Sequence, residues 1–321
     1  MSSAEKATIP APLLKADELE APPLSLGQLT WRRFRRHKMA MFGAVMLILL
    51  FVYAFAGTLF FTEDYGNLTD TTLRLQPPSL AHPFGTDTVG RDILARTIYG
   101  GQISLLIGLT AMLVEVVVGI LIGALAGYYG GWLDAVLMRF TEAMFVIPQI
   151  FLLIVMAKYF GTKVPDISLL GRTFSGSVVV VVLIIGLTSW MYLARIVRAE
   201  FISLKEREFV LAARATGTPA LQIIFGHILP NSMAPIIVSA TLSIASAILA
   251  ESYISFLGMG VQPPTATWGN MLQTASSDFN KIQNAPWFWL FPGMLILLTV
   301  LSINFLGDGL RDALDPRSRA A

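Results

Sequence analysis

Residues 203–231 read SLKEREFVLAARATGTPALQIIFGHILPN, and this polar stretch lies between two long apolar segments. Its first residues, Ser203 to Glu206, have the spacing of a capping box, in which both side chains bond to free amides at the start of a helix. Gly217 is expected to end that helix, because glycine readily adopts the left-handed cap conformation. Thr218 and Pro219 then predict the N-cap and the first position of a second helix. The stretch is therefore expected to form two short helices joined by a glycine turn.

The second predicted helix carries one apolar stripe. Leu221, Ile224, Phe225 and Ile228 follow the spacing i, i+3, i+4, i+7, and Pro230 is expected to end the helix. A DNA-binding helix-turn-helix is disfavoured, because the flanking apolar segments would hold the element at a membrane surface and its charges nearly balance. A purely structural surface hairpin is the remaining alternative to a docking element.

The composition of the chain is that of a membrane protein. Of its 321 residues, 55% are hydrophobic and only 14% are charged, with a mean hydropathy of +0.65. Soluble domains carry about 25% charged residues. The net charge of +2 is too small to favour nucleic acid. The chain has no cysteine and three scattered histidines, so disulfides and thiol chemistry are excluded and a metal cluster is not expected.

Six apolar stretches are long enough to cross a bilayer, for which a helix needs about 20 residues. They predict an all-α, polytopic membrane protein with six transmembrane helices, at residues 39–61, 103–127, 136–158, 178–198, 233–257 and 287–307. In the second span Gly119, Gly123 and Gly127 form a small-residue face, which favours close helix packing over the alternative of a pore lining.

The distribution of Lys and Arg predicts the orientation. The segments between spans fall into two groups, one on each side of the membrane, and the group that contains both termini and residues 203–231 has more Lys and Arg. Because cytoplasmic segments carry an excess of these residues, both termini and the insert are expected in the cytoplasm. Residues 1–30 are rich in Pro and Ala and are expected to form a disordered tail. The basic run Trp31–Lys38 is expected at the anionic inner headgroups. Because a long segment precedes the first span, that span is interpreted as an anchor and not a cleaved signal.

The polar insert also resembles a known motif. Ala212 and Ala213, the glycine at 217 and the proline at 230 are spaced as in the EAA motif of ABC importer permeases, which reads Glu-Ala-Ala, three residues, Gly, nine residues, Ile-x-Leu-Pro. Leu211 stands where glutamate is usual, and His227 stands where isoleucine is usual. The His-x-Leu-Pro variant resembles the dipeptide/oligopeptide/nickel subgroup.

Four further segments extend the resemblance over about residues 31–315. They are similar to the second, C-type permease subunit of peptide importers: RRFRRHKMAMFGAVM at 32–46, HPFGTDTVGRD at 82–92, AGYYGGW at 126–132, and SFLGMGVQPP at 255–264 with WGN at 268–270.

The resemblance implies a permease subunit that pairs with a second permease as a heterodimer, binds two cytoplasmic ATPase subunits, and receives substrate from an extracytoplasmic binding protein. It implies a coupling helix around Ala212–Pro219, which would transmit ATPase movement as a rigid body. The candidate ATPase-coupling residues are Leu211, Ala212, Ala213, Arg214, Thr216, Gly217, Thr218, Pro219, His227 and Pro230.

The chain itself is not expected to be an enzyme. The sequence contains no phosphate-binding loop of the form GxxxxGK[ST] and no evident nucleophile–base set. ATP and Mg are therefore expected on partner ATPase subunits, with no cofactor or metal bound by this chain.

Ionisable residues inside spans are candidates for function because burying them is costly. Glu115 lies near the middle of the second span and is predicted either to face the translocation path or to pair with a partner subunit. Glu251 lies toward the outer end of the fifth span, where substrate contact and an interface with the outer loop are both open. Glu142 is expected to pair locally with Arg139, three residues earlier.

The first outer loop, 62–102, contains alternating charges between Asp87 and Arg96, and a helix is expected from about Thr88. Arg91 and Asp92 are expected to order this loop, and docking of a binding protein is the alternative. The second outer loop, with Pro263, Pro264 and Trp268, has the same two interpretations.

The sequence thus predicts the permease subunit of an ATP-driven importer of di- or oligopeptides in the bacterial inner membrane, working by alternating access. Its parts would be a tail (1–30), an anchor helix and outer loop (31–102), and a permease domain (103–315) that includes the hairpin 203–231. Alternatives are an importer of nickel or another small solute, a stand-alone secondary transporter, which would need inverted repeats, and a membrane-embedded enzyme.

Overall fold

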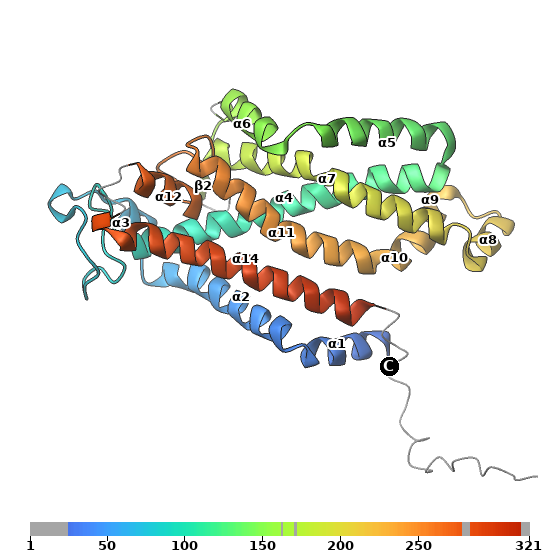
Figure 1. Ribbon diagram of the computed structural model, residues 1–321, viewed down its shortest axis with the longest axis horizontal. Helices are drawn as coiled ribbons and strands as arrows, with labels where there is room; N and C mark the ends of the chain where they lie inside the picture. The colour runs from blue at the N-terminus through green and yellow to red at the C-terminus, as the bar shows by residue number, and fades with distance from the viewer. Residues whose placement is uncertain (1–24, 162, 170–171, 278–282, 316–321) are drawn as a thin grey trace, which may run out of the picture.

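The computed structural model describes residues 25–161, 163–169, 172–277 and 283–315. These residues form an elongated bundle of helices that run along its long axis (Figure 1). Five of the helices are long and apolar enough to cross a membrane. They are α2 (Lys38–Ala56), α4 (Ile93–Tyr129), α7 (Gly176–Leu204), α11 (Met233–Phe256) and α14 (Pro286–Leu314). The prediction of an all-α, polytopic fold is confirmed.

The third predicted span, 136–158, is not one straight helix. It consists of α5 (Gly131–Val146) and α6 (Gln149–Phe160), which meet at an angle of 84°. The break falls at Ile147, which is extended, and Pro148. A residue before proline is driven out of the helical region by the proline ring, and proline cannot donate a helical hydrogen bond. The described part of the chain therefore has a sixth span only if this bent pair is counted as one.

The centre of the bundle is the pairing of α4 with α7. A side chain at Gly119 would lie 3.0 Å from Leu193, and one at Gly123 would lie 2.5 Å from the carbonyl oxygen of Ala194. Gly127 makes a similar approach to α7. The glycine face of α4 therefore packs against α7, as predicted, and does not line a pore.

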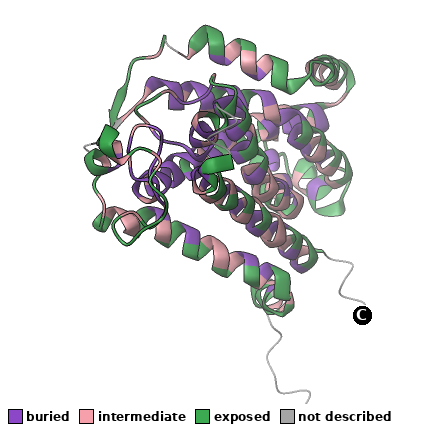
Figure 2. Cartoon of the chain, turned by 60° about the vertical axis from the view of Figure 1, so that its left-hand side comes forward, coloured by how far each residue is buried: buried purple, intermediate pink, exposed green. Residues whose placement is uncertain are grey.

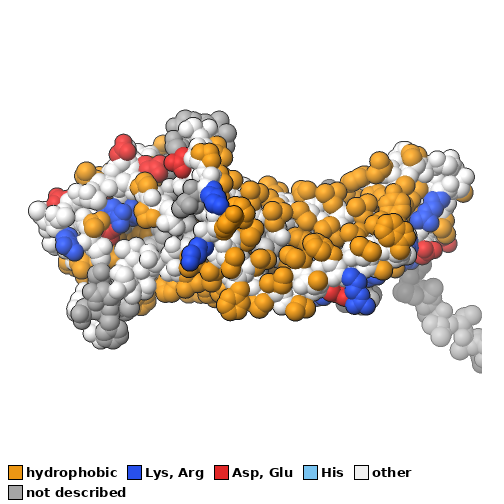
Figure 3. All heavy atoms as spheres, turned by 90° about the horizontal axis from the view of Figure 1, so that it is seen from above, with side chains coloured by type: hydrophobic (Ala, Val, Ile, Leu, Met, Phe, Trp, Pro, Cys, Tyr) orange, Lys and Arg blue, Asp and Glu red, His pale blue; other side chains and the backbone are white. Residues whose placement is uncertain are grey.

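Burial and surface composition agree with a protein that lies in a bilayer. Buried residues gather in the middle of the bundle, and exposed residues surround them (Figure 2). The face seen in Figure 3 has a broad hydrophobic band, with charged side chains gathered toward its two ends. Large exposed apolar side chains are found on α2, α4, α5, α6, α7 and α11.

One end of the bundle is covered by short elements. These are α3 (Glu63–Asn67), the turns Gly57–Leu59 and Thr71–Leu73, the paired strands β1 (Ile167–Leu169) and β2 (Arg172–Phe174), and α12 (Trp268–Ser276). The strands are antiparallel, with Ser168 opposite Thr173. The indole of Trp268 is fully buried and donates to the carbonyl oxygen of Thr97, 2.9 Å away, which fixes α12 to α4.

The helix expected from Thr88 begins only at Ile93. Asp92 is its N-cap, and the Asp92 carboxylate accepts from the amide of Ala95 at 2.8 Å. The preceding turn is held by Asp87, whose carboxylate accepts from the Arg91 side chain at 2.6 Å. Asp92 also bonds to the ring of His82 at 2.8 Å. The carboxylates therefore bond to a non-helical turn, an alternative to helix that short acidic side chains offer the backbone.

At the other end of the bundle, α1 (Leu26–Arg36) precedes α2. It begins with a capping box at Ser25, so the expected disordered tail 1–30 is wrong for residues 25–30, while residues 1–24 lie outside the described part. α1 packs on the end of α14 through Phe34 and Ala313. His37 lies 3.5 Å from Asp312 and joins the same two regions.

Candidate functional site

The insert 203–231 forms a compact hairpin at the end of the bundle opposite α12 (Figure 1). Its first helix, α8 (Glu208–Ala215), is followed by Gly217 with φ of +78°. The amide of Gly217 donates to Arg214, and the amide of Thr218 donates to Ala213. This is the pair of bonds of a Schellman motif, which requires the left-handed conformation that glycine supplies. The predicted glycine turn is present.

The start of the hairpin differs from the prediction. Ser203 lies inside α7, which continues to Leu204, and α8 has Arg207 at its N-cap with no side-chain bond. The proposed capping box is therefore wrong. The apolar sequence of α7 simply continues one turn further, so Ser203 has helical backbone on both sides and cannot occupy a cap.

The second half of the hairpin is irregular. It contains α9 (Ala220–Gln222), a π-helical turn (Ile223–Ile228, η4) and α10 (Leu229–Asn231). Pro219 is the N-cap of α9, not its first residue, and Thr218 makes no cap bond to it. Pro230 lies within α10 and does not end the second helix.

The π turn also moves the predicted apolar stripe. Ile224 and Ile228 are buried as expected, but Ile223 joins them, while Leu221 is 65% and Phe225 is 51% exposed. A π turn inserts an extra residue into one helical turn and so rotates the side chains that follow it relative to an α-helix. One 3.6-residue period therefore does not describe the whole segment, and it misplaces two of the four stripe residues.

The hairpin is fixed to the bundle by an apolar cluster. Val210 from α8 and Ile223, Ile224 and Ile228 from the return segment are buried against α4, α7 and α11. Phe201 of α7 is fully buried in the same cluster. A hairpin packed in this way moves with the ends of three long helices, because close-packed interiors transmit displacement and do not absorb it.

Polar contacts reinforce this attachment. Lys205 donates to the carbonyl oxygen of Gly127 at the end of α4, at 3.0 Å. The guanidinium of Arg214 lies 5.2 Å from the centre of the Tyr128 ring, within the range of a cation–π contact. Next to the hairpin, Arg198 of α7 binds both carboxylate oxygens of Asp134 on α5, at 2.5 and 2.6 Å. The hairpin thus sits where α4, α5 and α7 are joined.

The outer face of the hairpin is exposed and partly apolar. Of the candidate coupling residues, Ala213, Thr218 and His227 are half-buried, and Ala213 packs on the anchoring cluster. The exposed residues are Phe209, Leu211, Ala212, Arg214, Thr216, Gly217, Pro219, Leu221, Phe225 and Pro230. An exposed apolar surface of this kind on a compact element is typical of a protein–protein contact.

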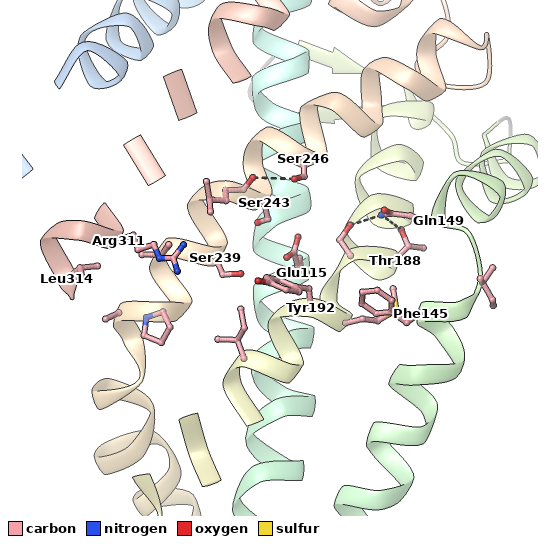
Figure 4. A pocket seen from close by; sticks show the side chains of 18 of the residues that line it. Glu115, Phe145, Gln149, Thr188, Tyr192, Ser239, Ser243, Ser246, Arg311 and Leu314 are labelled. Atoms are coloured by element: carbon pink, nitrogen blue, oxygen red, sulfur yellow. Dashed lines mark hydrogen bonds between the residues drawn. The ribbon is translucent and has the colours of Figure 1, made fainter. Parts of the chain in front are cut away.

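A second feature is a cavity of about 830 Å³ inside the bundle. Its walls come from α4, the α5–α6 break, α7, α11 and the end of α14 (Figure 4). Its lining includes Ala234 and Pro235 at the start of α11, close to the hairpin. Its polar lining residues are Glu115, Gln149, Thr188, Ser189, Tyr192, Ser239, Ser243, Ser246, Arg311 and Asp315. The volume lies within the range of about 300–1,000 Å³ that is usual for ligand sites.

Glu115 projects from the middle of α4 into this cavity (Figure 4). Its side chain is only 5% exposed, and Ser243 of α11 is its polar neighbour. Among the described residues, no Lys, Arg or His forms an ion pair with it. The structure places this candidate residue where a molecule in the cavity would meet its carboxylate.

Glu251 lies elsewhere. It is fully buried between α4, α11 and α12, and it does not line the cavity. Its carboxylate accepts from Ser104 at 3.2 Å and from Ser255 at 2.7 Å. These hydroxyls accept in turn from the amides of Trp268 and Val261. These contacts favour the interpretation of Glu251 as part of an interface with the outer loop over that of a substrate contact.

The remaining charged candidates form local pairs. Arg139 lies 3.1 Å from Glu142, and both side chains are exposed, as predicted for an i, i+3 pair. Arg91 and Asp92 order the turn before α4. Among the described residues, no group of three His, Asp or Glu could hold a metal ion.

Sequence reasoning missed most of the cavity. Gln149 follows the α5–α6 break and donates to the Ser189 hydroxyl at 3.0 Å. Pro148 was the available signal, because a proline inside an apolar span marks a break at which polar groups collect. The spacing of Ser239, Ser243 and Ser246 on one face of α11 was a second signal.

Comparison with known proteins identifies the family of this chain. Residues 119–320 match the family described as "Binding-protein-dependent transport system inner membrane component", and residues 25–78 match the "N-terminal TM domain of oligopeptide transport permease C". The chain belongs to this family of inner-membrane permease components. It is therefore a multi-pass membrane permease, and the predicted resemblance is confirmed.

Individual relatives cover nearly the full length. A dipeptide transport system permease protein of Bacillus subtilis (strain 168) is 39% identical over 306 residues, which is 95% of this chain and 90% of the relative. An oligopeptide transport system permease protein of Haemophilus influenzae is 38% identical over 307 residues, 95% of this chain and 93% of the relative. A glutathione transport system permease protein of Escherichia coli is 39% identical over 306 residues, 95% and 94% of the two chains.

Proposed function

We propose that this chain translocates di- or oligopeptides across the bacterial inner membrane as one of two permease subunits of an ATP-driven importer. The full-length relatives named above are permeases for dipeptides, oligopeptides and glutathione, which is itself a small peptide. This agreement supports peptide cargo over nickel. A secondary transporter would leave the exposed hairpin without a role.

The assembly follows from the same proposal. A second permease subunit completes a heterodimer, an extracytoplasmic binding protein delivers the peptide, and two cytoplasmic ATPase subunits bind ATP and Mg. The chain itself catalyses no reaction. Both termini and the hairpin face the cytoplasm, in agreement with the positive charge of α1 and of the hairpin end. The division into tail, anchor with outer loop, and permease domain (1–30, 31–102, 103–315) belongs to this proposal, with α1 now part of the anchor.

The hairpin is the coupling element. The observation that supports this role is its construction in two layers: one face is buried against α4, α7 and α11, and the other is exposed and apolar. An ATPase that binds the exposed face and moves would pull three helix ends together. Such rigid-body movement would open and close the cavity around Glu115, giving alternating access.

The test is co-purification of the ATPase. The tagged chain is extracted in detergent from its native membranes, and ATP hydrolysis is measured in the eluate. Ala212→Arg, at an exposed position in α8, combined with Gly217→Pro, which removes the turn, is expected to abolish the co-purified activity. The partner permease is expected to remain bound.

Gly258 offers a matched control at the opposite end of the molecule. Gly258 has φ of +75° and ends α11 with the same Schellman pattern as Gly217. Its amide donates to the carbonyl oxygen of Ser255, and the amide of Met259 donates to that of Ile254. Gly258→Pro is expected to leave the ATPase bound. If the hairpin variant keeps its ATPase, or the wild type never carries one, the coupling role is wrong and a self-contained transporter becomes the better explanation.

A further inference from the structure

Glu115 is a buried carboxylate that forms no ion pair with any described residue. Arg198 and Arg139 are paired with Asp134 and Glu142, and Arg311, which lines the same cavity, is exposed at the end of α14. Burying a carboxyl group in the middle of a span is costly. Such a cost is usually offset by a partner, and here the carboxylate faces an open volume instead of another side chain.

The rest of the cavity can bind an amide backbone. Ser239, Ser243 and Ser246 follow one another on the face of α11 that lines the cavity (Figure 4). Two of these hydroxyls donate to carbonyl oxygens of their own helix, from Ser243 to Ala240 and from Ser246 to Leu242. Their oxygens are therefore available as acceptors for N–H groups of a ligand.

These groups are suited to bind the backbone of a peptide and not a particular side chain of it. Apolar residues such as Phe145 and Met191 form much of the remaining wall. The other charged lining residues, Arg311 and Asp315, are exposed at the end of α14. The one deep carboxylate and the row of acceptors match a positively charged amine followed by peptide N–H groups. Every unmodified peptide has this pattern at its amino terminus.

We propose that Glu115 binds the protonated amino terminus of a peptide in transit, with the serine face of α11 accepting from the first peptide amides. This inference rests on the proposed function, because it assumes that peptides enter the cavity. It adds the chemical group that is recognised and the residue that recognises it. Binding must be weak enough for release, as in any conduction path.

The experiment measures binding to the assembled complex of both permeases and both ATPases, purified in detergent without the binding protein. Tri-alanine and N-acetyl-tri-alanine are titrated by calorimetry. Acetylation removes the positive charge and two of the three N–H donors of the amino terminus, and it adds one acetyl group. The wild type is expected to bind tri-alanine at least about tenfold more tightly, as for a hydrogen bond to a charged group.

Three variants assign the preference to one residue. Glu115→Gln keeps the shape but removes the charge, and it is expected to bind both peptides equally weakly. Glu115→Asp keeps the charge and is expected to retain most of the preference. Glu142→Gln is the matched control, since it removes an exposed carboxylate that lies outside the cavity, and it is expected to behave as the wild type.

Several results would overturn the inference. One is equal affinity of the wild type for the two peptides, or no binding of either up to their solubility limit. Another is a preference that survives in Glu115→Gln. Loss of the partner permease from Glu115→Gln would assign Glu115 to the subunit interface instead. Uptake of tri-alanine into proteoliposomes that contain the complex and the binding protein tests the proposed function separately. If the wild type takes up the peptide and Glu115→Gln does so equally well, the inference is refuted and the proposed function stands.

Discussion

Glu115 and Glu251 are both carboxylates inside long apolar helices, yet their surroundings are opposite. Glu251 accepts from hydroxyl groups on α4 and α11, while Glu115 faces a cavity with Ser243 beside it. The sequence signal is the same in both cases. The difference teaches that the cost of a buried acid is offset either by the fold, which makes the residue structural, or by a ligand, which makes it functional.

The largest difference between the two residues is expected when each carboxylate is removed. Glu251→Ala deletes the acceptor of Ser104 and Ser255 and leaves a closed void, so a loss of about 2–4 kcal/mol in stability is expected. Glu115→Ala enlarges an existing cavity and is expected to cost less than about 1 kcal/mol. Thermal unfolding in detergent should show a much lower Tm for the Glu251 variant only; equal losses would mean that Glu115 is also structural.

A finer test keeps the shape and removes the charge. In Glu251→Gln one acceptor oxygen becomes a donor that faces a serine hydroxyl, so a loss of about 1–2 kcal/mol is expected. Glu115→Gln removes an unpaired buried charge and is expected to leave the Tm unchanged or raised. A lowered Tm for Glu115→Gln would reveal a cationic partner in the assembly and contradict the comparison.

Much of the fold could be predicted from sequence because it follows from one-dimensional signals. Apolar runs of sufficient length gave the spans, and Gly217 gave the turn, since only its left-handed conformation is needed there. The starts of elements were less predictable. Ser203 has the chemistry of a cap but lies within α7, because the apolar sequence before it continues the helix.

The candidate site was harder to predict, because it depends on contacts between distant segments. Glu115 was identified by its charge alone, but its serine neighbour comes from α11, more than 120 residues later. Leu221 and Phe225 were placed on the buried stripe, but both are exposed, Phe225 within the π turn and Leu221 just before it. Such a turn has no periodicity that a sequence would reveal in advance.

One serine beside each carboxylate gives a third, smaller comparison. Ser104 joins Glu251 to the amide of Trp268 and is fully buried, so Ser104→Ala leaves both groups short of a partner. A loss of about 1–2 kcal/mol is expected. Ser243 donates to its own helix, so Ser243→Ala is expected to be neutral in stability. The ranking is checked by unfolding both variants under the same conditions, and a reversed order would refute the closed network around Glu251.

The smallest effect is expected where a carboxylate is paired but exposed. Arg139 and Glu142 lie 3.1 Å apart with side chains that are 85% and 59% exposed. Water screens such a pair, so a double-mutant cycle of Arg139→Gln and Glu142→Gln should give a coupling of no more than about 0.5 kcal/mol. If this end of α5 lies at the headgroups, where the dielectric constant is lower, the coupling should rise when the chain is moved from detergent into anionic vesicles. A coupling as large as the effect of Glu251→Gln would show that distance alone, and not enclosure, sets the energy of these carboxylates, and the contrast between Glu115 and Glu251 would lose its physical basis.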